Sequence, residues 1–277
     1  MTDQIFYTDL MAFFKTNDQV AINYQLKGNP TGQTIIFVEG YSGNEATWCA
    51  QISDFIQAGF RVLTYDRRNH GHSQTVPFGM QIARHGMDLA ELIAKLNLKK
   101  PILIGHSMGA GTIFAYLSLF GCNNIQALVT EDQSPKAISD DNWPFGLFNA
   151  NWQNFSKKAR LIATTKLTRL TINDDIKRAL GLAYSSYQPF DFQFNYPLLI
   201  DSLVQDWRPE IKNETVRHLF LAGSASPLWS CEHAKSAASL NPLAEDYVFQ
   251  GTGHIPHLES PKEFNQLVIN FIHNNNN

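Results

Sequence analysis

One ten-residue stretch, ILIGHSMGAG at residues 102–111, constrains the fold of this chain more than any other. Its apolar first half is typical of a buried strand, and a helical pattern begins directly after it. A serine in a G-x-S-x-G turn between a strand and a helix lies at a tight, strained corner, where its hydroxyl projects freely. The helix N-terminus then presents backbone N–H groups to any anion formed there. The pattern predicts that Ser107 is a nucleophile; the alternative is a glycine-rich turn with an incidental serine.

Short apolar runs alternate with longer helical ones along the chain, which favours an α/β fold. Several apolar runs are nearly continuous, as expected for strands that helices cover on both faces. Strands are expected at residues 20–26, 34–40, 61–66, 101–107, 125–132, 216–223 and 245–251. Helices are expected at residues 46–60, 85–98, 109–121 and 261–272.

A histidine near the end of the chain is the candidate base. His254 follows an expected strand in the glycine-flanked loop GTGHIPH and precedes an amphipathic final helix. A base must lie on a loop that reaches back over the strand ends to the serine. His257 is the competitor, although its position is more typical of a helix entry or a surface.

Four segments, in this order, resemble the α/β-hydrolase-fold superfamily over nearly the whole chain outside residues 136–208. They are IIFVEGYSGNEATW, YDRRNHGHSQ, GHSMG and GTGHIPHLESPKEFN. The resemblance implies a mostly parallel sheet flanked by helices, and an oxyanion hole made by the backbone N–H groups of Met108 and Tyr41. Two residues depart from the family pattern: Glu39 replaces a histidine, and Asn69 replaces a glycine. Glu39 could change how the oxyanion loop is braced, or add charge near the site.

The carboxylate that should orient the histidine is absent from the position where the family usually has it. That position, after LFLAG, holds Ser226, and no Asp or Glu occurs between Glu214 and Glu232. The family's other position is the end of the strand after the nucleophile helix, where Glu131 and Asp132 stand. The following Q-S-P favours Asp132, whose alternative task is to cap a turn. Glu131 is the second choice, and a dyad without an acid is the third.

Residues 136–208 interrupt the alternation of strands and helices with a helix-like stretch that is rich in aromatic residues. We expect a helical cap inserted into a core of residues 1–135 and 209–277; the alternative is a set of helices that complete the core. Aromatic side chains that face a pocket favour a small to medium, largely apolar substrate. The expected substrate contacts are Trp143, Phe145, Phe148, Trp152, Tyr184 and Tyr187. Further aromatic residues of the cap are Phe155, Phe190, Phe192 and Phe194.

Composition excludes several classes of partner. A formal charge of −3 and a pI near 6.3 give no electrostatic reason to expect nucleic acid or an anionic membrane. No apolar run reaches the roughly 18 residues that span a bilayer, and the N-terminus is a poor signal peptide. Cys49, Cys122 and Cys231 are widely spaced and odd in number, so a disulfide framework is not expected. We therefore expect a cytoplasmic protein, either a monomer or a homodimer.

Neither a metal nor a cofactor is expected. His70 and His72 form an H-x-H pair, but no cluster of acidic residues follows it, so structural or surface histidines are the better interpretation. The asparagine tail after His273 is expected to be frayed.

Ser107, His254 and Asp132 together predict an acyl-transfer site. The expected reaction is hydrolysis of a carboxylic ester, thioester or lactone through an acyl-serine, and a serine at the elbow argues against alkyl-halide and epoxide chemistry. Two alternatives stay open. One is a cofactor-independent dioxygenase or lyase, in which a His254–Asp132 dyad deprotonates the substrate. The other is a non-catalytic ligand-binding protein, which Glu39 and Ser226 motivate.

Overall fold

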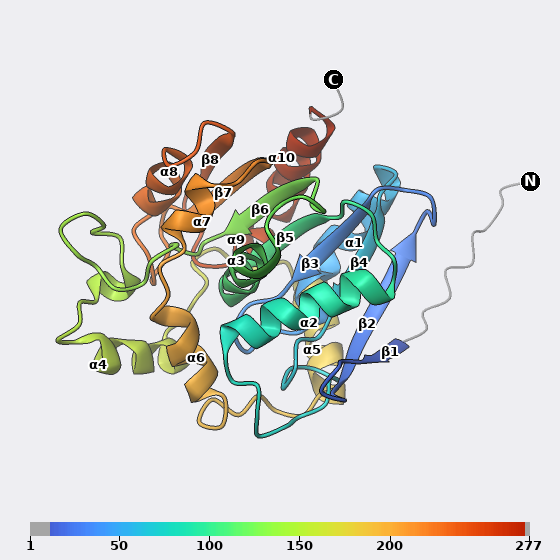
Figure 1. The fold of residues 1–277 in the computed structure, drawn as a ribbon, viewed down its shortest axis with the longest axis horizontal. Coiled ribbons are helices and arrows are strands. Elements are labelled where there is room, and N and C mark those ends of the chain that lie inside the picture. The colour runs from blue at the N-terminus through green and yellow to red at the C-terminus, as the bar shows by residue number, and fades with distance from the viewer. Residues whose placement is uncertain (1–11, 275–277) are drawn as a thin grey trace, which may run out of the picture.

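An eight-stranded sheet forms the centre of the computed structural model, which describes residues 12–274 (Figure 1). The strand order is β1-β2-β4-β3-β5-β6-β7-β8. The pairs β1–β2 and β2–β4 are antiparallel, and all other neighbouring strands in this order are parallel. The expected mostly parallel sheet flanked by helices is confirmed. Beyond residue 274, the tail expected to fray lies outside the described residues.

The elements have the following bounds. The strands are β1 (Ala12–Lys15), β2 (Ala21–Gly28), β3 (Thr34–Val38), β4 (Arg61–Tyr65), β5 (Ile102–His106), β6 (Ala127–Glu131), β7 (Arg217–Gly223) and β8 (Ala244–Phe249). The α-helices are α1 (Cys49–Gln57), α2 (Ile82–Lys95), α3 (Met108–Phe120), α4 (Phe155–Ala159), α5 (Asp174–Ser186), α6 (Tyr196–Leu203), α7 (Arg208–Lys212), α8 (Glu232–Ala238), α9 (Pro256–Glu259) and α10 (Pro261–His273). Three short 3₁₀ helices are η1 (Glu45–Trp48), η2 (Leu147–Asn149) and η3 (Arg160–Thr164).

The parallel strands divide the interior into two cores. Ile36 and Leu103 lie side by side in register and point into the core that α2 and α3 cover. Ile35 and Ile102, one residue earlier in each strand, point into the opposite core beneath α1 and α10. Successive side chains of a strand face opposite sides, so continuous apolar runs are the pattern that two covered faces require.

Each expected strand region contains an observed strand, within a few residues at either end. The sequence pattern does not predict β1, which has four residues and pairs only with β2 at the edge of the sheet. An edge strand forms backbone hydrogen bonds with only one neighbouring strand, and it buries little side-chain surface. The AFFK stretch therefore carries no strong period of its own.

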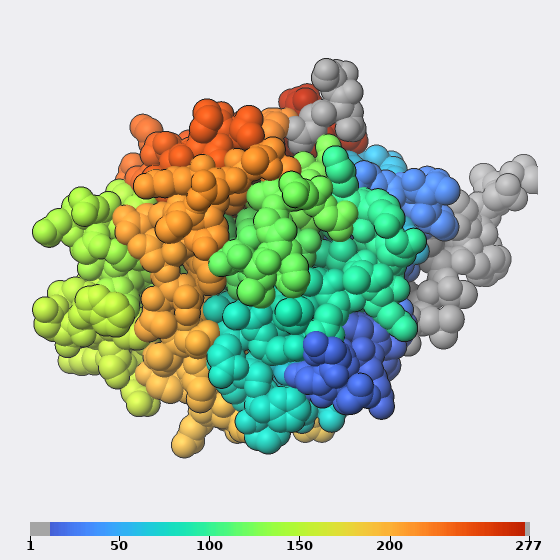
Figure 2. All heavy atoms as spheres, viewed as in Figure 1, coloured from blue at the N-terminus to red at the C-terminus, as the bar shows by residue number. Residues whose placement is uncertain are grey.

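The segment between β6 and β7 is helical and contains α4, α5, α6 and α7, with η2 and η3. Its two ends lie side by side, because Lys136 and Asp206 form an isolated antiparallel bridge. Beside them, the Trp207 backbone N–H donates to Pro135 O at 2.9 Å. In Figure 2 the light-green residues of the first half of this segment form one flank of the molecule. The assignment of residues 136–208 as a separate cap stays a prediction.

Two further sequence expectations concern membrane-spanning helices and disulfide bonds. Among residues 12–274, none of the helices combines the length and apolar character needed to cross a membrane. Cys49, Cys122 and Cys231 are all free.

Candidate active site

Ser107 stands at the corner between β5 and α3 with φ 52° and ψ −123°. A positive φ is strained for a residue with a side chain, so the surroundings must hold it. The Ser107 N–H donates to Glu131 O at 2.9 Å, and the Ser107 carbonyl accepts from Ala110 N at 2.8 Å. The neighbouring strand and the first turn of α3 thus fix the corner at the carboxyl edge of the sheet.

The glycines around this corner are required by close contacts. A Cβ on Gly109 would lie 2.1 Å from Val38 O, and one on Gly105 would lie 2.7 Å from the backbone of α3. Gly40, just after β3, packs on the same corner, because a Cβ there would lie 3.2 Å from Ser107 Cβ. The loop after β3 therefore lies in direct contact with Ser107.

His254 is buried in the loop between β8 and α9. Its Nδ1 lies 2.5 Å from Asp132 Oδ2. Its backbone N–H donates to Leu167 O at 2.8 Å, and its carbonyl accepts from His106 Nε2 at 2.9 Å. Burial lowers the pKa of His106 to about 3, so that ring is neutral near pH 7. With Nδ1 bound to Asp132, Nε2 is the ring nitrogen of His254 that is left for proton transfer.

Asp132 follows β6 directly and is fully buried, with φ 47°. Its Oδ1 accepts from Gly223 N at 3.0 Å, and its Oδ2 accepts from Ser226 Oγ at 2.6 Å. Burial alone would raise the pKa of Asp132, but interactions with His233 and His254 hold it well below its usual range. His233 Nε2 stands 4.0 Å from Oδ1. Asp132 is therefore ionised at neutral pH, and the hydroxyl at the family's usual acid position supports it.

Glu131, the second-choice acid, binds a different histidine. Its Oε1 accepts from His257 N at 2.7 Å, and its Oε2 lies 2.6 Å from His257 Nδ1. Burial raises the pKa of Glu131 to about 7 and lowers that of His257 to about 3. The His257 ring stacks on Trp48, with 4.2 Å between centroids. The two adjacent carboxylates thus serve two histidines, and Asp132 is the one paired with His254.

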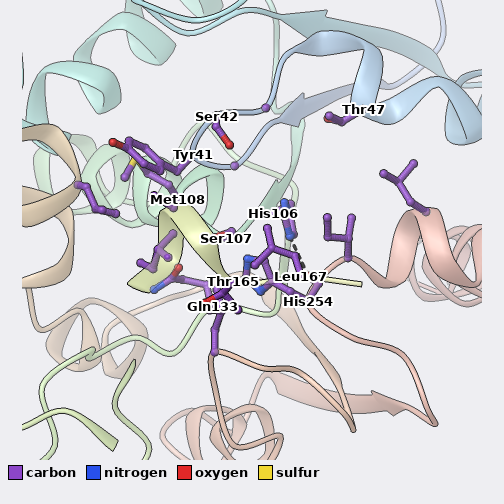
Figure 3. A pocket seen from close by; sticks show the side chains of 18 of the residues that line it. Tyr41, Ser42, Thr47, His106, Ser107, Met108, Gln133, Thr165, Leu167 and His254 are labelled. Atoms are coloured by element: carbon purple, nitrogen blue, oxygen red, sulfur yellow. Dashed lines mark hydrogen bonds between the residues drawn. The ribbon is translucent and has the colours of Figure 1, made fainter. Parts of the chain in front are cut away.

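Ser107 and His254 line one cavity, together with Tyr41, Met108 and His106 (Figure 3). In Figure 3, Tyr41 and His254 lie on opposite sides of Ser107. Within residues 12–274, no hydrogen bond joins Ser107 Oγ to His254 Nε2. Such contacts are often long in unliganded sites and tighten when substrate binds.

The backbone N–H groups of Tyr41 and Met108 donate to no partner in the described part of the chain. Met108 is the first residue of α3, where helical N–H groups have no partner within the helix. Both residues line the cavity that Ser107 lines, so two residues with unpaired backbone donors belong to its wall.

A buried ion pair braces the loop that carries Tyr41. Glu39 Oε1 accepts from the Arg67 backbone N–H at 2.9 Å and from its Nε at 3.1 Å. Arg67 also donates from an Nη to Gly40 O at 2.8 Å. Gly40 C=O and Tyr41 N–H belong to one planar peptide, so this bond fixes the direction of the Tyr41 N–H. Burial raises the pKa of Glu39 to about 7, against the opposing effect of the Arg67 charge.

The cavity has a volume of about 360 Å³ and a largely apolar wall. Of the six aromatic residues expected to contact substrate, only Tyr184 lines it. Apolar residues of the same segment, such as Ile162 and Leu167, take the positions expected for aromatic rings. Phe192, another aromatic residue of the segment, also lines the cavity.

The other five aromatic residues lie elsewhere, for reasons that their contacts make clear. Trp143 is buried and donates from Nε1 to Ser134 Oγ at 2.9 Å, and Phe145 packs edge-on against it. Phe148 packs partly buried against the main core. The Tyr187 hydroxyl donates to Glu45 Oε1 at 3.0 Å, and Trp152 is 70% exposed. Most of these rings therefore anchor the segment and do not line the Ser107 cavity.

Sequence reasoning misses two residues that shape the site. Trp229 lines the cavity, and its buried Nε1 has no hydrogen-bond partner in residues 12–274. Glu259 accepts from the backbone N–H groups of Gly253, Arg169 and Leu170 at 3.0, 2.7 and 2.7 Å. It ties the His254 loop to the helical segment. The sequence could have suggested Trp229 only through its position after β7, because functional groups gather at the carboxyl ends of strands.

A family model described as "alpha/beta hydrolase fold" matches residues 33–155. A non-heme chloroperoxidase of Kitasatospora aureofaciens is 32% identical over 138 residues, which are 50% of this chain and 50% of that protein. The chain thus spans about half the length of this relative. An sn-1-specific diacylglycerol lipase of Mus musculus is 27% identical over 261 residues, or 89% of this chain and 83% of that protein.

Solved structures agree with the architecture. An esterase from Exiguobacterium antarcticum superposes with a TM-score of 0.81 at 19% identity, covering 95% of this chain and all of the other. At this identity the match concerns the fold alone.

Proposed function

We infer that the chain belongs to the α/β-hydrolase-fold superfamily, because a family model matches residues 33–155 and a relative is similar over most of the chain. From this premise we propose that it is a serine hydrolase that cleaves a carboxylic ester, thioester or lactone through an acyl-serine intermediate. The observation that carries the proposal is the chain of contacts from Asp132 to His254, in the cavity where Ser107 stands at a strained corner.

In the first half-reaction, His254 Nε2 takes the proton of Ser107 Oγ as the oxygen attacks the carbonyl carbon. The ionised Asp132 holds Nδ1–H and stabilises the imidazolium that forms. The C–O bond of the ester then breaks, and the leaving alcohol takes the proton from Nε2. The acyl group stays on Ser107.

In the second half-reaction, water replaces the alcohol. His254 Nε2 takes a proton from the water, whose oxygen attacks the acyl carbon, and Ser107 Oγ leaves with that proton. The carboxylic acid departs and the serine is regenerated. Each half-reaction returns His254 to its neutral form.

The unpaired N–H groups of Tyr41 and Met108 are the proposed donors to the tetrahedral oxyanion. Donors fixed in advance are worth more than mobile ones, because they do not reorganise as charge develops. Arg67 is a proposed positioning residue here, since its bond to Gly40 O directs the Tyr41 N–H. Glu39 holds Arg67 in place and balances its charge.

The proposed substrate has a small to medium apolar part, because apolar residues such as Ile162, Leu199 and Leu228 line the cavity. Short-chain esters and lactones fit a space of about 360 Å³.

A panel of short-chain methyl and p-nitrophenyl esters and lactones tests the proposal on wild type and Ser107→Ala. We expect turnover by wild type and a loss of at least about a thousandfold in kcat for the variant. Undiminished turnover by Ser107→Ala would instead favour chemistry in which the His254–Asp132 pair abstracts a proton without an acyl-serine. No turnover by wild type on any substrate would contradict a hydrolase.

A further inference from the structure

The helical segment carries an uncompensated run of positive charge. The only charged residues between Asp141 and Asp174 are Lys157, Lys158, Arg160, Lys166 and Arg169. The chain as a whole has a formal charge of −3, so the net charge of this segment is opposite in sign to that of the whole chain. The same stretch supplies Ile162, Ala163 and Leu167 to the wall of the Ser107 cavity. The segment that carries this positive charge therefore also forms part of that wall.

None of these five side chains forms an ion pair in the described part of the chain. Lys158 Nζ donates instead to Phe148 O and Asn149 O at 2.6 and 2.9 Å. Arg169 donates to the carbonyls of Lys166 and Thr168. These two cations are thus engaged with backbone carbonyl groups.

Arg160 differs from these two, because within residues 12–274 its side chain makes no hydrogen bond. Its guanidinium lies over the Tyr196 ring, 4.6 Å from the centroid. Stacking of this kind holds a guanidinium in place and leaves its N–H groups free for a planar partner. Arg160 is therefore a positioned cation without an anion.

Arg160 lines a hollow of about 420 Å³ that adjoins the Ser107 cavity. Four residues line both spaces: Tyr41, Ala163, Phe192 and Leu199. Among the described residues, Arg160 is the one charged residue of the hollow's wall, and Gln193 adds an amide. The Ser107 cavity and a hollow that holds a single positive charge therefore share one wall.

We propose that this hollow binds a carboxylate of the substrate, so that the substrate class is esters or lactones that carry a carboxylate. The inference rests on the proposed function for its catalytic half. A carboxylate suits the site because a guanidinium pairs with it through two parallel hydrogen bonds. A phosphate or polyphosphate would call for more than one cation in the wall.

Tyr41 sets the distance between the two ends of the substrate. Its backbone N–H is the proposed oxyanion donor, while its residue also forms the wall shared with the Arg160 hollow. In the proposed binding mode the reacting carbonyl and the carboxylate lie on either side of Tyr41, so a short chain has to join them. Monoesters of short dicarboxylic acids have this form.

The kinetic test compares monomethyl succinate, glutarate and adipate with neutral methyl esters of equal chain length. Wild type should favour the anionic ester in kcat/KM for at least one length. Arg160→Gln should lower that preference about tenfold, mainly through KM, as expected for one charge-assisted contact. Lys157→Gln is the matched control, because Lys157 lies on the same segment but lines neither space, and it should keep the preference.

A binding test separates this inference from the proposed function. Monomethyl glutarate is titrated calorimetrically into Ser107→Ala and into Ser107→Ala with Arg160→Gln. We expect Kd to rise about tenfold in the second protein. An unchanged Kd, or an equal effect of Arg160→Gln on anionic and neutral esters, would overturn the inference while leaving the hydrolase proposal standing. Arg160-dependent binding without any ester turnover by wild type would support the anion site and contradict the hydrolase.

Discussion

At the scale of single residues, the adjacent pair Glu131–Asp132 shows how far sequence reasoning reaches. The sequence indicates that a carboxylate at this position could replace the one missing at Ser226. The following Q-S-P favours Asp132 over Glu131, but the sequence does not show that each carboxylate binds a histidine of its own. In the structure, Glu131 is the last residue of β6 and points to His257, whereas Asp132 lies just past the strand and points to His254.

Ser226 has a role that the sequence does not suggest. Its hydroxyl donates to Asp132 Oδ2 at 2.6 Å, so the vacated position helps to hold the relocated acid. Ser226 can donate to Asp132 only because the folded sheet brings the loop after β7 next to the end of β6.

Asp132→Asn should lower kcat by about a thousandfold or more with little change in KM, because the variant loses the charge that stabilises imidazolium and fixes its tautomer. Steady-state kinetics on any turned-over ester measures this. Glu131→Gln is the matched comparison, since it alters the neighbouring carboxylate, and its effect on kcat should be far smaller. The reverse order of the two effects would show that the acid is Glu131.

Glu39→Gln should change how stability depends on pH. Burial raises the folded-state pKa of Glu39 to about 7 from 4.5. A raised pKa gives stability that is fully present below 4.5 and is lost as pH rises through 7. The stability of wild type relative to the variant should therefore fall by on the order of 2–3 kcal/mol between pH 5 and pH 8.

Urea unfolding at the two pH values measures this difference. A gap between wild type and Glu39→Gln that stays constant, or grows toward pH 8, would show that Arg67 keeps Glu39 ionised throughout.

At the scale of elements, the strands of the parallel core could be located from sequence because both faces of each are buried. The aromatic residues of the helical segment could not be placed in the same way. A ring is as useful for anchoring a helix to the core as for lining a pocket, and Trp143 finds its partner in Ser134. Whether a ring anchors the segment or lines a pocket depends on the direction of short helices such as α4. The hydrophobic period of the sequence does not determine that direction.

Gly109→Ala should destabilise the protein by about 2 kcal/mol or more, because its Cβ would lie 2.1 Å from Val38 O. The β5–α3 corner would also shift, so activity should fall. Gly181→Ala is the control: this glycine lies in α5, a Cβ there meets nothing within 4 Å, and the helix should gain up to about 1 kcal/mol.

Thermal and urea unfolding of both variants measure the contrast. Equal stability of Gly109→Ala and wild type would mean that the backbone of the β5–α3 corner shifts at little cost, which would contradict its close packing against Val38.

At the scale of the whole molecule, the fold class and the carboxyl edge where the candidate site lies could be predicted from sequence. The cavity wall could not, because it combines the loop after β3, the start of α3, the helical segment and the loop after β7. The Arg160 hollow is of the same kind, since it joins Tyr41 to residues more than a hundred positions later in the chain. Such juxtapositions depend on the folded arrangement of segments that are distant in sequence.

The central claim is that Ser107 becomes acylated with His254 as its base. Intact-protein mass spectrometry after reaction with a fluorophosphonate, followed by peptide mapping, tests it most directly. The account predicts one adduct per chain, located on Ser107, absent from Ser107→Ala and formed at least about a hundredfold more slowly in His254→Ala. An adduct that forms at the wild-type rate in Ser107→Ala would contradict the account.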